Sequence, residues 1–270
     1  MIELNKIYNE NNCETMARMD DNSIDLTVTS PPYDNLRLYQ GYSFNFERVA
    51  QELFRVTKEG GVVVWVVNDE TLNGTESLTS FKQAIYFKEQ CGFNLHDTMI
   101  WKKPGFSAVG ALATRYAPVF EYMFVISKGK PKTFNPIKDR KNIAKGTISG
   151  TIMNADGTRK RMSNEGKPRM DYGQRFNIWE ITQVNVNENH PAAFPEKLAQ
   201  DHIISWSNEG EVVYDPFMGS GTVAKMCIKT NRNYVGSEIS QEYCELAEKR
   251  ILPYKQQNDL FYENLTKNST

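Results

Sequence analysis

The sequence lacks the features that mark membrane, secreted and zinc-binding proteins. No apolar run approaches the roughly 18 residues that a membrane-spanning helix needs, and residues 1–12 hold no apolar signal core. The four cysteines Cys13, Cys91, Cys227 and Cys244 stand apart, without the paired spacing of a zinc site or a disulfide framework. We therefore expect a soluble, cytoplasmic protein that binds no metal.

An excess of basic residues over the whole chain is also missing. The formal net charge is -1 and the pI is about 6.4, so any nucleic-acid site must be a local patch. The 270 residues, 40% of them hydrophobic, suffice for one large α/β domain with an insertion.

The first motif that is present is Val28-Thr29-Ser30-Pro31-Pro32-Tyr33, at the end of an apolar run that begins at Ile24. The two prolines stop the predicted strand and hold Ser30 and Tyr33 rigidly at its carboxyl end. Open α/β sheets bind their ligands at that edge. Taken alone, however, the pattern favours an ordinary proline turn.

A second motif runs from Val212 to Thr222, where an apolar strand leads into Asp215 and a glycine-rich turn before a predicted helix over residues 223–229. A phosphate loop would need a lysine before its Ser or Thr, and the glycine spacing differs from the dinucleotide fingerprint. An acidic strand end before a glycine turn suits a ligand that is cationic or rich in hydroxyl and amino groups. S-adenosylmethionine is such a ligand.

The two motifs resemble those of S-adenosylmethionine-dependent DNA amino-methyltransferases. Residues 29–33 are similar to the catalytic motif, residues 215–222 to the cofactor motif, and residues 190–195 (HPAAFP) to the cofactor-side motif that precedes it. The catalytic motif comes first, which is the permuted order of the β group. The resemblance covers most of residues 5–252 and is weakest at about 130–185. It implies an α/β fold with a doubly wound, mostly parallel, Rossmann-like sheet and an inserted target-recognition region.

The periodicity of apolar residues agrees with such a fold. It predicts helices over residues 14–18, 46–54, 78–90 and 241–251 and from Pro195 onward, with a Gly60-Gly61 pair ending the second helix. It predicts strands over residues 7–8, 24–28, 62–67, 95–101, 119–127, 212–215 and 234–238. This alternation indicates a parallel, doubly wound sheet. We divide the chain into a catalytic half (1–127), a basic target-recognition insertion (128–188), a cofactor-binding half (189–252) and a polar tail (253–270).

Positive charge is concentrated in the predicted insertion. Residues 128–175 carry thirteen Lys and Arg against four Asp and Glu, a local charge of +9 in a chain whose total is -1. Contacts to DNA phosphates would follow from that charge. A solvated, partly disordered insertion is the competing interpretation.

The chemistry is constrained by a further absence. Methylation of a cytosine ring carbon needs a thiolate nucleophile, and the sequence contains no Pro-Cys pair. An exocyclic amino nitrogen can instead attack the activated methyl directly. The resemblance implies that the Ser30 hydroxyl and the Pro31 carbonyl accept the amino hydrogens while Tyr33 stacks on a base flipped out of the duplex.

The identity of the methylated base depends on Ser30. Relatives with serine before the two prolines are mostly cytosine-N4 enzymes, so we expect cytosine N4, with adenine N6 as the alternative. Asn11 stands where relatives usually carry an acid that touches the cofactor's adenine, and Glu10 is one place early. An inactive methyltransferase-fold protein that binds DNA as a regulator is therefore a further alternative, as is an RNA or protein methyltransferase.

The expected partner is double-stranded DNA, without a membrane, and the sequence leaves open both a cognate restriction endonuclease and a homodimer. The predicted catalytic residues are Ser30, Pro31, Pro32 and Tyr33. The predicted cofactor-binding residues are Asn11, Thr29, His190, Phe194, Pro195, Asp215, Pro216, Phe217, Gly219, Ser220, Gly221, Thr222 and Glu238. The predicted DNA-binding residues are Arg37, Arg115, Lys138, Arg140, Lys141, Arg159, Lys160, Arg161 and Arg169.

Overall fold

A computed structural model describes residues 2–32, 45–105, 114–183 and 195–267, with side chains up to residue 257. The chain divides into two compact units, which are described separately: residues 1–135 with 177–270, and residues 136–176. The expected insertion at 128–188 is therefore too wide. Its two ends belong to the larger unit, where residues 178–180 form a strand of the main sheet.

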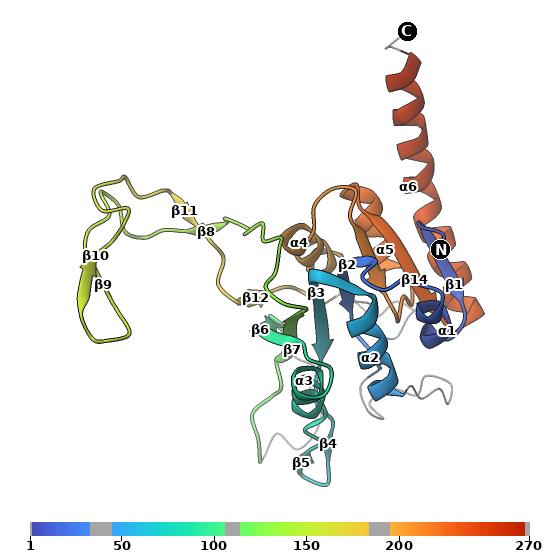
Figure 1. The fold of residues 1–270 in the computed structure, drawn as a ribbon, viewed down its shortest axis with the longest axis horizontal. Coiled ribbons are helices and arrows are strands. Elements are labelled where there is room, and N and C mark those ends of the chain that lie inside the picture. Colours follow the sequence, from blue (N-terminus) through green and yellow to red (C-terminus); the bar gives the residue numbers. More distant parts are fainter. Residues whose placement is uncertain (1, 33–44, 106–113, 184–194, 268–270) are drawn as a thin grey trace. The chain divides into compact units, whose positions relative to one another are not determined.

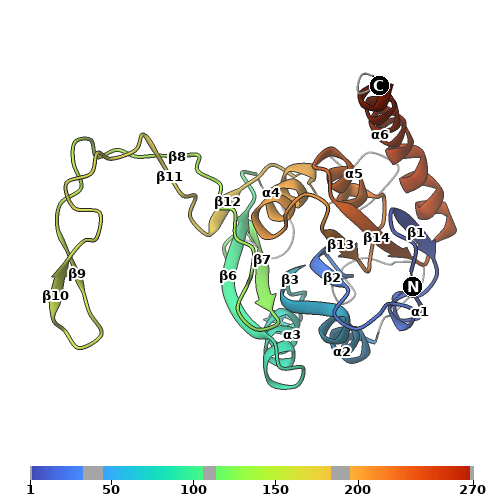
Figure 2. The same ribbon diagram turned by 45° about the horizontal axis from the view of Figure 1, so that its top comes forward.

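The larger unit is built on one eight-stranded sheet (Figures 1 and 2). In spatial order its strands are β1 (Lys6–Asn9), β14 (Asn233–Glu238), β13 (Val212–Asp215), β2 (Ile24–Thr29), β3 (Thr57–Val67), β7 (Phe120–Ser127), β6 (Asn94–Lys102) and β12 (Ile178–Glu180). Neighbouring strands are parallel except that β7 is antiparallel to both β3 and β6. The predicted mostly parallel sheet is confirmed.

In the described part of the chain, six helices flank this sheet in two layers. They are α1 (Asn12–Ala17), α2 (Phe46–Val56), α3 (Thr79–Glu89), α4 (Glu196–Trp206), α5 (Thr222–Lys229) and α6 (Gln241–Lys267). The helices α1, α2 and α3 pack beside one another on one face, and α4, α5 and α6 lie on the other, as Figure 2 shows. A small hairpin, β4 (Thr71–Leu72) with β5 (Thr75–Glu76), precedes α3.

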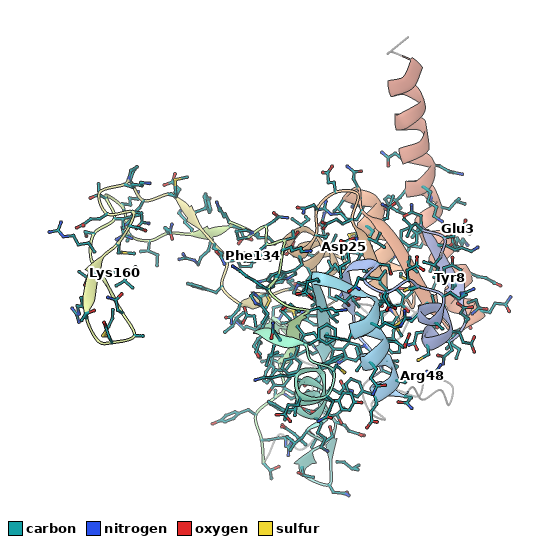
Figure 3. The ribbon with its side chains drawn as sticks, viewed as in Figure 1. Glu3, Tyr8, Asp25, Arg48, Phe134 and Lys160 are labelled. Carbon is teal, nitrogen blue, oxygen red and sulfur yellow. The ribbon has the colours of Figure 1, made fainter. Side chains whose placement is uncertain are left out.

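Strand β2 is the fourth of the eight strands and is paired on both of its edges, with β13 and with β3. Its register places Thr27 beside Tyr214 of β13 and Val63 of β3. Asp25 of β2, labelled in Figure 3, accepts hydrogen bonds from the Lys58 ammonium at 2.7 Å and from the backbone N–H of Val212 at 2.9 Å. Three adjacent strands are thereby joined at the edge opposite the predicted site.

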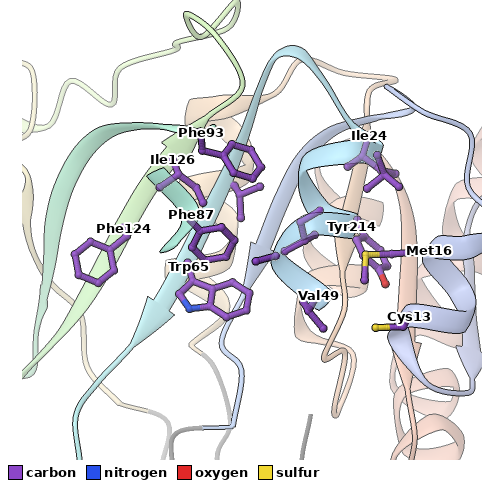
Figure 4. Close-up of a cluster of buried hydrophobic side chains, with 14 of the residues drawn as sticks. Cys13, Met16, Ile24, Val49, Trp65, Phe87, Phe93, Phe124, Ile126 and Tyr214 are labelled. Atoms are coloured by element: carbon purple, nitrogen blue, oxygen red, sulfur yellow. The ribbon is translucent and has the colours of Figure 1, made fainter. Parts of the chain in front are cut away.

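The core under α1–α3 is rich in aromatic rings (Figure 4). Trp65 of β3 lies 5.2 Å from the Phe87 ring in an edge-on arrangement, and its indole N–H donates to Gln83 at 2.8 Å. Trp65 and Phe87 are fully buried, and burial of such side chains contributes about 1.5–3 kcal/mol each. This packing holds the central strands in place behind the site.

Two element boundaries differ from the sequence-based expectation. The Gly60-Gly61 pair does not end α2, because Thr57 already has extended backbone and the glycines lie inside β3. Gly60 instead adopts a φ of +80° and its N–H donates to the carbonyl of Lys128 at 2.6 Å. The predicted end of the last helix at residue 251 and the tail from residue 253 are also wrong, since α6 continues through Pro253 to Lys267.

The smaller unit, residues 136–176, consists of two short antiparallel ladders. Strand β8 (Arg140–Lys141) pairs with β11 (Tyr172–Gly173), and β9 (Thr151–Met153) pairs with β10 (Arg159–Arg161). An isolated bridge joins Thr147 to Pro168. The basic segment thus forms short antiparallel ladders over this range.

No helix in the described part of the chain is long and apolar enough to cross a membrane.

Candidate active site

The two sequence motifs meet where β2 and β13 end. The hydroxyl of Thr29, the last residue of β2, donates a 2.7 Å hydrogen bond to Oδ1 of Asp215, the last residue of β13. Both side chains are buried. The same Asp215 oxygen accepts from the backbone N–H of Phe217 at 3.0 Å, which fixes the start of the following turn.

Asp215 is a carboxylate in an apolar setting. Its burial raises its pKa to about 7, against which the hydrogen bonds from Thr29 and Phe217 act. Within the part of the chain that the structure describes, no group donates to Oδ2 of Asp215. That oxygen therefore remains available to accept a hydrogen bond from a ligand or to face a positive charge.

The turn after Asp215 depends on two glycines. Gly219 and Gly221 have φ values of +50° and +78°, a backbone region that L side chains rarely adopt. A Cβ at Gly221 would also lie 2.9 Å from Cβ of Ala247 in α6. Glycine at position 221 thus allows the turn to pack closely against that helix.

Glu238 lies at the carboxyl end of the neighbouring strand β14. Its two carboxylate oxygens accept from the backbone N–H groups of Gly219 at 2.8 Å and Ser240 at 2.9 Å. Burial raises the pKa of Glu238 as well. Each oxygen has a further lone pair, so Glu238 can accept hydroxyl donors while it holds the turn.

The predicted catalytic motif continues directly from the end of β2. Ser30 is half-buried and Pro31 is buried, and both follow Thr29 without a break. The bond from Thr29 to Asp215 therefore places Ser30 one residue away from the junction of the two motifs. Tyr33, His190 and Phe194, and also Arg37, lie outside the described residues.

A hydrogen-bond network centred on Arg250 of α6 supports the glycine turn. The sequence motifs did not predict this network. The guanidinium of Arg250 donates to the carbonyl and hydroxyl oxygens of Ser220 at 3.1 and 3.0 Å and to the hydroxyl of Thr222 at 3.1 Å. It also donates to Oε1 of Glu196 at 2.6 Å, an oxygen that accepts from Lys225 at 2.7 Å. Nothing in the local sequence marks Arg250, because it lies 30 residues after Ser220.

Glu196 connects this network to the third motif. It is the first residue of α4 and follows Pro195, the last residue of the HPAAFP motif. Pro195 is buried and occupies the N-cap position of the helix, as the sequence predicts. The turn after Asp215 and the start of α4 are thereby held to the same arginine.

The side chains of residues 10–12, close to the predicted adenine contact at Asn11, contact different parts of the structure. The Asn11 side chain accepts from the backbone N–H of Cys13 at 2.9 Å and caps α1. Glu10 accepts from the Thr15 hydroxyl at 2.7 Å and pairs with Arg18. The adjacent Asn12, which the motif comparison missed, is buried and donates to the carbonyl of Pro216 at 3.2 Å. Asn12 thus reaches the glycine turn, whereas Asn11 and Glu10 are engaged within their own segment.

The predicted DNA-binding residues fall into two places. Arg115 belongs to the larger unit and donates to the Thr71 hydroxyl at 2.9 Å and to the Gly74 carbonyl at 2.7 Å, both in the β4–β5 hairpin. The remaining described ones belong to the smaller unit: Lys138, Arg140, Lys141, Arg159, Lys160, Arg161 and Arg169.

The site has acceptors but no metal-ligand cluster. No three His, Cys, Asp or Glu side chains come together as metal ligands among residues 2–32, 45–105, 114–183 and 195–257. Asp215 and Glu238 offer carboxylate acceptors at the carboxyl ends of two parallel strands, with the Phe217 ring beside Trp65 at 6.3 Å. These acceptors fit a cationic ligand that carries hydroxyl groups.

The chain resembles several proteins of known class over most of its length. It is 57% identical over 244 residues to the orphan methyltransferase M.BamHII of Bacillus amyloliquefaciens, a match that covers 87% of this chain and 91% of the relative. Two solved structures share the fold. The cytosine-N4-specific PvuII DNA methyltransferase has a TM-score of 0.67 at 19% identity, with 93% and 91% of the two chains covered.

The second structure is that of a Thermus thermophilus protein in complex with S-adenosyl-L-methionine, with a TM-score of 0.60 at 23% identity. That match covers 92% of this chain and 95% of the other. The family described as DNA methylase, N6_N4_Mtase, matches residues 24–249. This range includes β2, β13 and the part of α6 that precedes Arg250. The chain therefore belongs to the N6/N4 DNA methylase family.

Proposed function

We propose that this chain is a site-specific DNA methyltransferase that modifies the exocyclic amino group of a flipped base, and that this base is cytosine, at N4. The observation that carries the proposal is the bond from Thr29 to Asp215, which brings the catalytic and cofactor motifs of a DNA methylase to one point. The choice of cytosine is supported by Ser30 before the two prolines, because relatives with serine at this place are mostly cytosine-N4 enzymes.

The cofactor is S-adenosylmethionine, which supplies an activated methyl group on a sulfonium sulfur. Asp215 and Glu238 would hold it as acceptors, and their ionised carboxylates would suit its positive charge. Glu238, at the end of β14, accepts ribose hydroxyls, as acids at this position do in nucleoside-binding α/β folds. The turn over residues 216–221 lets the ligand approach the backbone closely.

Ser30 and Pro31 hold the acceptor base. The Ser30 hydroxyl and the Pro31 carbonyl accept the two amino hydrogens, which directs the nitrogen lone pair toward the methyl group. No covalent bond to the enzyme is needed, so positioning supplies most of the rate acceleration. The resemblance implies that Tyr33 stacks on the base, which would leave the duplex at a cost of about a few kcal/mol.

The experiment is single-turnover transfer from tritiated S-adenosylmethionine to duplex DNA, followed by mass spectrometry of the nucleosides. We expect N4-methylcytosine. N6-methyladenine would establish the alternative base, since the serine form of the motif also occurs in adenine enzymes. Absence of label in DNA, with cofactor binding retained, would favour the inactive DNA-binding regulator. A cognate restriction endonuclease and a homodimer stay predictions.

A further inference from the structure

The smaller unit, residues 136–176, carries a strong positive charge of its own. It contains ten Lys and Arg against four Asp and Glu, a net charge of +6 in a chain whose total is -1. Such a unit is attracted to a polyanion regardless of sequence. Charge alone therefore indicates DNA phosphates and does not say how a target sequence is recognised.

Three of its arginines are engaged within the unit. Arg175 pairs with Asp139, Arg140 donates to the carbonyl of Gln174 at 2.9 Å, and Arg161 lies 3.4 Å from Glu165 with 83% of its side chain exposed. The other seven basic residues are exposed and form no side-chain hydrogen bond or ion pair to a described residue: Lys138, Lys141, Lys145, Arg159, Lys160, Lys167 and Arg169.

The strands β9 and β10 arrange part of this charge on a two-stranded ribbon, on which Figure 3 labels Lys160. Arg159 is opposite Met153, and Arg161 is opposite Thr151. Residues directly opposite in an antiparallel pair point to the same face, and neighbours in a strand point to opposite faces. One face therefore presents two arginines, Thr151 and Met153.

The other face of the ribbon carries one basic residue and no arginine, because it presents Lys160 opposite Ile152. All six residues of the two strands are exposed, and the side chain of Met153 is 65% exposed although it is apolar. The connecting turn is ordered by Asp156, which accepts from the backbone N–H of Thr158 at 2.9 Å. Within the described residues of its own unit, nothing covers the face that carries the arginines.

We propose that the β9–β10 ribbon enters the major groove of the DNA substrate and reads base edges with the face that carries Arg159 and Arg161. This inference rests on the proposed function. The major groove admits a two-stranded β-ribbon, and arginine forms bidentate hydrogen bonds to O6 and N7 of guanine. Thr151 and Met153 offer a hydroxyl and an apolar surface that fits the thymine methyl. Lys160, on the opposite face, contributes charge without base recognition.

The test separates base recognition from phosphate attraction by using the two faces of one ribbon. Arg159→Ala, Arg161→Ala, Lys160→Ala and, outside the ribbon, Lys167→Ala are prepared in the full chain. Each protein selects duplexes from a randomised DNA library in the presence of S-adenosylhomocysteine, and the bound duplexes are sequenced. Affinity for the parent's preferred duplex is then measured at several salt concentrations.

We expect each arginine variant to lose about five- to hundredfold in affinity for the preferred duplex and to relax the preference at one or two base pairs. Lys160→Ala and Lys167→Ala should keep the preference. Unchanged preferences in both arginine variants would overturn the inference, as would a parent that selects no sequence or equal relaxation by Lys160→Ala. Selection without methyl transfer would instead contradict the proposed function and leave the ribbon's role intact.

Discussion

Thr29 and Asp215, 186 residues apart in the sequence, are joined by a buried hydrogen bond of 2.7 Å between the ends of adjacent parallel strands. Thr29 immediately precedes the Ser-Pro-Pro turn, and Asp215 immediately precedes the glycine turn. A change in either side chain should therefore alter both turns.

Removal of the Thr29 hydroxyl should weaken cofactor binding without unfolding the protein. Thr29→Val keeps the shape of the side chain but leaves Oδ1 of Asp215 with the Phe217 N–H as its one described donor, so ionisation of Asp215 becomes harder. We expect calorimetric affinity for S-adenosylmethionine to fall about three- to thirtyfold at pH 7. Thr29→Ser is the matched control, because it retains the hydroxyl. Equal affinities for the valine variant and the parent would contradict the coupling.

Asp215 should be more important for binding than for folding. Asp215→Asn can still accept from Thr29 and Phe217 but lacks the negative charge, so cofactor affinity should fall about tenfold or more. Because the parent buries a charged carboxylate above pH 7, the asparagine variant should unfold at the same temperature as the parent or a higher one at pH 8. A folded variant with parental affinity would remove Asp215 from the cofactor site.

Cofactor binding should depend on pH near neutrality. Burial raises the pKa of Asp215 to about 7 from its ordinary 3.8, and the ionised form is the better acceptor. Affinity should therefore rise several-fold between pH 6 and 8 in the parent, and less in Asp215→Asn, which also corrects for titration of the ligand.

The same raised pKa makes stability depend on pH, because the folded state holds the Asp215 proton more tightly than the unfolded chain does. Its contribution to stability is thus full below about pH 3.8 and is lost as the pH rises through 7.

Ser30 should serve the chemical step. Ser30→Ala removes one oxygen from a residue that two prolines hold at the end of β2, so the fold and cofactor affinity should be retained. We expect kcat to fall about ten- to a thousandfold, which corresponds to about 1.4–4 kcal/mol of transition-state stabilisation. Single-turnover methyl transfer under saturating cofactor measures it. A parental rate would leave the Ser-Pro-Pro segment as a structural turn.

Arg250 should influence the affinity for the cofactor through the glycine turn that it supports. Arg250→Ala removes the donors that its guanidinium supplies to Ser220, Thr222 and Glu196, so the glycine turn loses its support. We expect KM for S-adenosylmethionine to rise about tenfold, with a smaller effect on kcat. Arg250→Lys keeps the charge beside Glu196 but not the planar fork, and should restore part of the affinity.

The neighbouring Lys249→Ala is the control for Arg250, because Lys249 is exposed and lies on the same helix. A change in unfolding temperature alone, with parental KM in Arg250→Ala, would reduce Arg250 to a structural residue.

The local sequence determined the features that depend on short-range chemistry. Prolines after Thr29 stop β2 because they cannot continue a strand, and Gly219 and Gly221 adopt positive φ at little cost. The apolar runs predict seven of the eight strands of the main sheet, and their alternation with helices predicts a mostly parallel sheet. They do not predict β12, and they place the start of β3 at residue 62 instead of Thr57. Asp215 and Glu238 could be assigned to one edge because parallel strands share the edge at which they end.

Tertiary structure decided what depends on contacts between distant segments. Pro253 would stop a lone helix at a cost of about 3 kcal/mol, yet α6 continues, with the Tyr254 ring 4.8 Å from Lys225 and Lys255 paired with Glu248. The role of Arg250 arises only when α6 packs against the turn at Gly221. No local pattern encodes that contact, because its free energy comes from packing between segments that the sequence separates by about thirty residues.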